Sequence, residues 1–199
     1  MRKTLDKLIS WTGLIMAAVL VVAGGLLMYA SSFVASNVHD QLSQQNITMP
    51  AAAALETQAQ KDALLQYAGQ QMTTGDQAKA FADNYILVHM NAASNNRTYD
   101  QVSGEFLTMS KNPNADQAKL AELGQLRQTL FMGNTLRGLL LNAYAFGTMG
   151  TIAFWAAIAS FVGAALLLVL GLLGLRHAKT AEDEATVQAG HARTIPQTA

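Results

Sequence analysis

Two stretches without a charged residue or a histidine decide the fold: LISWTGLIMAAVLVVAGGLLMYASSFVASNV at residues 8–38 and GLLLNAYAFGTMGTIAFWAAIASFVGAALLLVLGLLGL at residues 138–175. A helix needs roughly 20 apolar residues to cross a hydrocarbon layer about 30 Å thick. Both stretches are longer than that. The sequence therefore predicts two transmembrane helices, at residues 8–33 and 147–175, with a domain at residues 34–146 between them.

The composition agrees with a membrane protein and excludes several classes of site. Only 13% of the 199 residues are charged, about half of the share of roughly 25% in soluble domains. The formal net charge is zero, so the basic footprint of a nucleic-acid-binding protein is missing. There is no cysteine, which excludes disulfides, zinc–thiolate sites and thiol nucleophiles.

The charges beside the two spans predict the topology. Short basic flanks stay on the cytoplasmic side of a membrane, and here the flanking basic residues are Arg2, Lys3, Lys7, Arg176 and Lys179. We therefore expect residues 1–7 and 176–199 in the cytoplasm, with the latter as a disordered tail, and residues 34–146 outside. A cleaved signal peptide ending near Ser32 is the alternative to a retained first span.

The intervening segment is predicted to be a bundle of three to five helices. Residues 51–71 are rich in helix formers. Capping residues stand three positions before a glutamine at Thr74, Thr98 and Asn114, the spacing of a capping box. Apolar residues recur every three or four positions, which indicates one buried stripe per helix; the stripes are Phe81, Tyr85 and Val88; Tyr99, Val102, Phe106 and Met109; and Leu120, Leu123, Leu126 and Leu130. No stretch alternates with period two, so the fold class is all-α.

Two regions are candidates for binding a partner or a lipid. The second apolar run is longer than a bilayer requires, so its first part should couple the bundle to the span, with Arg137, Tyr144 and Phe146 as contacts. A guanidinium there suits a phosphate or a carboxylate, although snorkelling to the interface is the alternative. The other region is the polar loop at residues 91–99, with Asn95 and Arg97.

Both predicted spans contain small residues spaced by four. These are Gly13 and Ala17 in the first span and Ala156, Ser160 and Ala164 in the second. Such faces allow helices to approach closely in lipid. We expect the two spans to pack on each other, with another membrane protein or a second copy as further partners beside the lipid bilayer.

A metal site is the remaining chemical candidate. His39 and His89 could join a carboxylate of Asp40, Asp83 or Glu105 in a two-histidine, one-carboxylate site. Their spacing does not place them together. We therefore predict no catalytic residue, no metal and no cofactor.

The residues VHMNAASNNRTYDQVSGEF (88–106) and LRQTLFMGNTLRGLLLNAYAFGTMGTIA (126–153), with the N-terminal RKTLDKLISWTGLIMAAVLVVAGGLL, resemble a family of two-pass actinobacterial membrane proteins of unknown function. The resemblance covers most of residues 1–179. Members are sometimes labelled aromatic ring-opening dioxygenases. The resemblance implies a bacterial plasma membrane and carries over no site residues.

Three functions remain open from the sequence. The leading hypothesis is a non-enzymatic accessory or scaffold subunit that interacts with other membrane proteins. The alternative is an extracytoplasmic binding module for a lipid or a small apolar ligand. A metal-dependent enzyme of the dioxygenase-labelled kind is the second alternative.

Overall fold

A computed structural model describes the backbone of residues 2–193 and the side chains of residues 4–180. The described chain is all-α, with no strand between residues 2 and 193. It divides into two compact units. The span unit comprises residues 2–31 and 151–193, and the central unit comprises residues 32–150.

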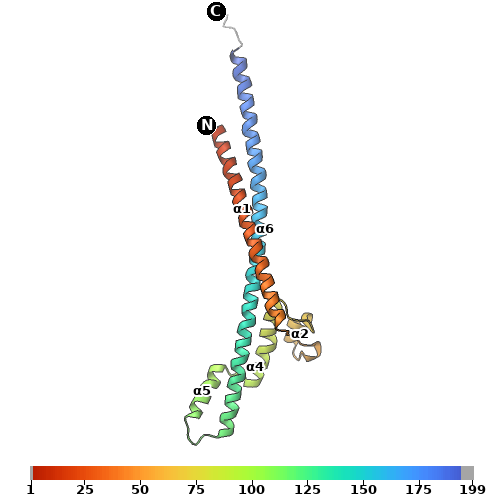
Figure 1. Ribbon diagram of the computed structural model, residues 1–199, viewed down its shortest axis with the longest axis vertical. Coiled ribbons are helices and arrows are strands. Elements are labelled where there is room, and N and C mark those ends of the chain that lie inside the picture. Colours follow the sequence, from red (N-terminus) through yellow and green to blue (C-terminus); the bar gives the residue numbers. More distant parts are fainter. Residues whose placement is uncertain (1, 194–199) are drawn as a thin grey trace, which may run out of the picture. The chain divides into compact units, whose positions relative to one another are not determined.

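Two long helices run through both units, α1 (Arg2–Gln44) and α6 (Gln117–Arg193) (Figure 1). Both are long and apolar enough to cross a membrane, with a mean hydropathy of 2.3 and 2.5 in their most apolar windows. Only 11% and 17% of those windows is buried inside the protein. The coarse prediction of two long apolar helices is thus confirmed.

The span unit is held by small residues where its two helices meet. Ala17, Ala157 and Ala164 are each at most 3% exposed. A methyl group added at Gly171 would lie 3.2 Å from the carbonyl oxygen of Ser10, and one at Gly24 would lie 3.0 Å from the ring of Phe161. The predicted packing of one span on the other is confirmed, and it uses the faces that carry Ala17 and Ala164.

The central unit contains residues 32–44 of α1, residues 117–150 of α6 and the short helices between them. These are η1 (Ala52–Ala54), α2 (Gln58–Leu64), η2 (Leu65–Tyr67), α3 (Gly75–Phe81), the π-helical η3 (Ala82–Ile86), α4 (Leu87–Ser94) and α5 (Tyr99–Ser110). Two clusters of apolar side chains form its core. The larger joins α1, α2, α3 and α6 around Leu42, Leu64, Met72 and Leu140. The smaller joins α4, α5 and α6 around Met90, Val102 and Leu130.

Two of the three predicted capping boxes are confirmed. The side chains of Thr74 and Thr98 each accept a hydrogen bond from the backbone amide three residues on. The side-chain oxygen of the glutamine at that position accepts in turn from the backbone amide of the threonine. The third is wrong. Asp116 Oδ1 accepts from the amides of Ala118 at 2.9 Å and Lys119 at 3.3 Å, so the helix begins after Asp116 and not after Asn114.

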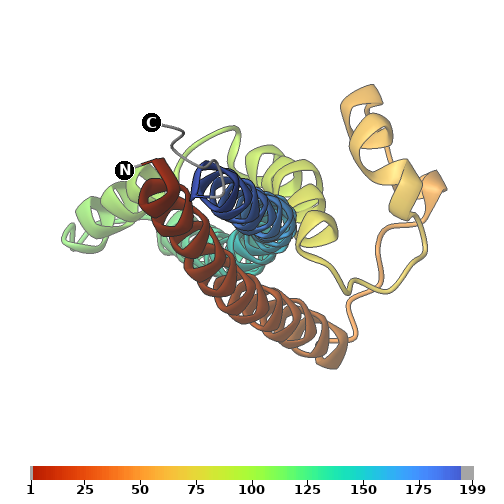
Figure 2. The same ribbon diagram turned by 90° about the horizontal axis from the view of Figure 1, so that it is seen from above.

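Residues 51–71, which are rich in helix formers, do not form one continuous helix. Thr57 and Gln60 form a capping box that starts α2 afresh at Gln58. Gly69, with a φ of +71°, ends the segment. The chain then pairs back on itself, since Met49 N donates to Gln70 O at 2.8 Å and Met72 N to Ile47 O at 2.8 Å. In Figure 2, η1 is a coil apart from that of α2 and η2.

The residues of the predicted apolar stripes differ in how deeply their side chains are buried. Leu130 is 1% exposed and Val102 is fully buried, but Phe106, expected in the core, is only half-buried. Its ring lies 5.2 Å from the guanidinium of Arg127. At the C-terminus the helix continues to Arg193, where a disordered tail was expected, because adding residues to an existing helix requires no new nucleus. Residues 194–199 lie outside the described chain.

Candidate functional site

The five predicted contact residues do not form one site. Arg137, Tyr144 and Phe146 lie on α6, whereas Asn95 and Arg97 lie between α4 and α5. Even the three residues on α6 serve different contacts. Arg137 and Tyr144 bind other parts of the central unit, and Phe146 lines a groove.

Arg137 is occupied inside the protein. Its Nη2 lies 2.9 Å from Asp83 Oδ1, and its Nε donates to the carbonyl oxygen of Ala82 at 3.1 Å. The side chain is only 22% exposed. The guanidinium therefore ties α6 to the π-helical turn η3.

A second cation completes this ion pair. Lys79 Nζ lies 2.6 Å from Asp83 Oδ2 and 5.5 Å from the centre of the Tyr144 ring. The hydrogen bond from Lys79, together with that from Arg137, holds the pKa of Asp83 below its ordinary value of 3.8, although partial burial opposes the shift. The same hydrogen bond and the charge of Asp83 raise the pKa of Lys79 above 10.5. The cluster stabilises the packing of α3 and η3 on α6.

Two residues of the polar loop at residues 91–99 make contacts within the protein. Asn95 takes the left-handed conformation with a φ of 53° and ends α4. Arg97 donates to the carbonyl oxygen of Ser94 at 3.0 Å and pairs with Glu105 at 2.7 Å. These contacts fix the turn between α4 and α5.

A further candidate site is a groove of about 400 Å³ between α1 and α6 in the central unit. We call it the α1–α6 groove. Phe146, the last of the five predicted contact residues, lines it and is 55% exposed. Its apolar lining consists of Phe33, Val34, Val38, Leu42, Leu139, Ala143 and Phe146, and its polar lining of Asn37, Gln41, Gln45 and Asn142.

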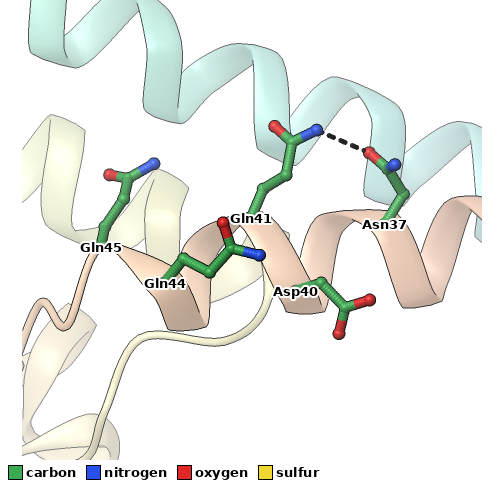
Figure 3. Close-up of a pocket in the computed structure, with 5 residues that line it drawn as sticks. All are labelled: Asn37, Asp40, Gln41, Gln44 and Gln45. Carbon is green, nitrogen blue, oxygen red and sulfur yellow. Dashed lines mark hydrogen bonds between the residues drawn. The ribbon is translucent and has the colours of Figure 1, made fainter.

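The polar edge of this groove continues along α1. Figure 3 shows the neighbouring hollow that Asn37, Asp40, Gln41, Gln44 and Gln45 line. Gln41 Nε2 donates to Asn37 Oδ1 at 3.0 Å, one helical turn away. Asp40 projects from the opposite side of the helix in this view. Three carboxamides spaced by four thus form a row at Asn37, Gln41 and Gln45. We call it the amide row.

The sequence did contain a signal for this site. Val34, Val38 and Leu42 recur every four residues, and each stands three positions before a carboxamide, at Asn37, Gln41 and Gln45. That pattern places an apolar stripe beside a hydrogen-bonding stripe on one helix. The pattern on one helix does not show which other helix meets it, so it could not by itself predict a groove with α6.

The two histidines considered as metal ligands are both exposed to solvent. His39 is exposed on α1, and His89 is exposed with its ring 4.3 Å from that of Tyr85. His89 Nδ1 lies 2.7 Å from the carbonyl oxygen of Tyr85. Among residues 4–180, no three side chains of histidine, aspartate or glutamate gather closely enough to hold an ion.

No family model, no curated protein and no solved structure matches the chain significantly.

Proposed function

We propose that this chain is a two-span, non-enzymatic protein of a bacterial plasma membrane, with both termini in the cytoplasm, that binds a lipid or a small apolar ligand in the α1–α6 groove. The observation that carries the proposal is the lining of the groove, with seven apolar side chains beside four carboxamides. Ligand sites in proteins combine such mostly apolar walls with a few polar groups that orient the ligand.

The position of the groove along the chain supports a ligand from the bilayer. Phe33 is the last residue of the predicted first span, and Phe146 directly precedes the predicted second span. Both phenyl rings are more than half exposed. Aromatic side chains at the level of the headgroups commonly border the hydrocarbon, so an acyl chain could enter this groove without crossing water.

Binding of a fluorescent acyl probe to the purified full chain in detergent tests the proposal. Asn142→Trp should block the groove, because Asn142 lines it and is exposed on α6. Asn134→Trp is the matched control, since Asn134 is also exposed on α6 but does not line the groove. Loss of binding in the first variant alone supports the proposal. Equal binding by both variants contradicts it.

A second candidate function is the accessory or scaffold subunit, bound to another membrane protein or to a second copy. It is favoured by exposed aromatic residues on α6, where Phe154 and Trp155 form an edge-to-face pair with 5.6 Å between ring centres. Such side chains contact lipid equally well. Affinity purification from native membranes distinguishes the two functions, because a partner held through the span would be retained in the Asn142→Trp variant.

A further inference from the structure

The α1–α6 groove has a polar edge of one chemical kind. Its four polar lining residues, Asn37, Gln41, Gln45 and Asn142, are all carboxamides. A carboxamide offers both donors and an acceptor and carries no charge. Such an edge can hydrogen-bond to hydroxyl, ester or amide groups of a ligand.

No cation lines the groove as the structure describes it. Arg137, two residues before Leu139 on α6, is held by Asp83 and Ala82. Lys79 is likewise paired with Asp83. The charged residue next to the amide row is Asp40, which lines the adjoining hollow together with Asn37 and Gln41.

The lack of a cation in the described lining of the groove disfavours an anionic headgroup. A phosphate bound at the amide row would lose water without gaining a cation. Phosphate sites in proteins usually contain arginine, lysine or a helix N-terminus. An uncharged head meets no such opposition, and its hydroxyl groups would replace water at the carboxamides.

We propose that the α1–α6 groove selects a lipid with an uncharged, hydroxyl-bearing head, such as a diacylglycerol, over an anionic phospholipid with the same chains. This proposal rests on the proposed function and adds the class of the ligand. The groove volume of about 400 Å³ is near the lower end of the usual range for ligand sites. It therefore takes the head and the first part of a chain and not a whole lipid.

The test uses the full chain in vesicles that contain a photo-crosslinkable diacylglycerol or a photo-crosslinkable phosphatidic acid with identical chains at equal mole fraction. Mass spectrometry of the labelled peptides measures the crosslinked fraction at residues 33–45 and 139–146. We expect the diacylglycerol to label these residues about tenfold more, which corresponds to about 1.4 kcal/mol.

A variant that adds a cation to the amide row makes the selection itself testable. Gln41→Lys should shift labelling toward the phosphatidic acid. Gln125→Lys, at an exposed position of α6 outside the groove, should keep the wild-type preference.

The possible failures are distinguishable. Equal or stronger labelling of the wild-type groove by phosphatidic acid overturns the selection for an uncharged head and leaves the proposed function standing. Absence of lipid label from the groove overturns both. A crosslink between two protein chains at the groove, in place of lipid, assigns it to a second copy and overturns both as well.

Discussion

Gly75 at the start of α3 lies directly against the backbone of Tyr144 on α6. A methyl group at Gly75 would stand 2.9 Å from Tyr144 Cα and 3.0 Å from the carbonyl oxygen of Ala143. Real side chains almost never approach backbone so closely, and neither of these atoms is at the end of a flexible side chain. The absence of a side chain at Gly75 thus allows α3 to pack on the part of α6 that also lines the groove.

The first prediction concerns this contact. Gly75→Ala should lower the free energy of unfolding of the full chain in detergent by about 1–3 kcal/mol, because two backbone segments must move apart. Gly104→Ala is the control, since an added methyl at Gly104 meets nothing within 4 Å. That variant should gain up to about 1 kcal/mol from better helix propensity. Similar unfolding curves for the two variants would show that α3 does not pack on α6 in this way.

The second prediction is a pH dependence that comes from Asp83. Its pKa is lowered in the folded protein, chiefly by the hydrogen bond from Lys79 and also by that from Arg137. The stability from this group is therefore present above its ordinary pKa of 3.8 and is lost as the pH falls through the lower folded value. The raised pKa of Lys79 contributes stability that is present below 10.5 and is lost as the pH rises through the higher folded value.

Asp83→Asn should remove the acidic part of this dependence. The variant should lose about 1–3 kcal/mol at neutral pH, since Arg137 and Lys79 lose their charged partner. Unfolding measured between about pH 2.5 and 7 checks both effects. Asp62→Asn is the control, because Asp62 is exposed and accepts only from Gln58 among the described bonds. An unchanged acid limb in Asp83→Asn would contradict the assigned role.

The third prediction ranks core positions on α6. Leu130 is 1% exposed and packs with Met90 and Val102. Leu130→Ala should therefore destabilise the protein by about 2–5 kcal/mol. Leu136→Ala, at a position that is 47% exposed, should change the stability by less than about 0.5 kcal/mol. Comparable losses in the two variants would mean that the leucine stripe faces another direction.

Local signals in the sequence predicted local structure well. The capping boxes at Thr74 and Thr98 each depend on a residue and its neighbour three positions on, so spacing alone reveals them. The burial of Leu130 followed from its helical stripe in the same way. Two charge-free runs were sufficient to predict the long apolar helices.

Contacts between distant segments could not be predicted. Arg137 and Asp83 are 54 positions apart, and no spacing rule relates them. The sequence consequently treated Arg137 as available to a lipid or partner. The groove was missed for a similar reason, because its lining combines residues 33–45, in α1 and directly after it, with residues 139–146 of α6. Each half is visible in the sequence, but their meeting depends on the packing of the central unit.

The fourth prediction tests the topology that the basic flanks suggest. The chain has no cysteine, so a single introduced thiol gives an unambiguous signal. An impermeant thiol reagent applied to intact cells should label Asn112→Cys and should not label Thr180→Cys until the membrane is opened. Both positions are exposed on the protein. Labelling of both in intact cells would contradict a cytoplasmic C-terminus with an external central unit.

The most direct test of the central claim is native mass spectrometry of the full chain released from detergent. We expect the wild type and Asn134→Trp to carry a bound lipid after mild delipidation, and Asn142→Trp to carry none while unfolding at the same temperature. Lipid retained by Asn142→Trp at the wild-type level, or no lipid on any of the three proteins, would contradict the assignment of the α1–α6 groove as a lipid site.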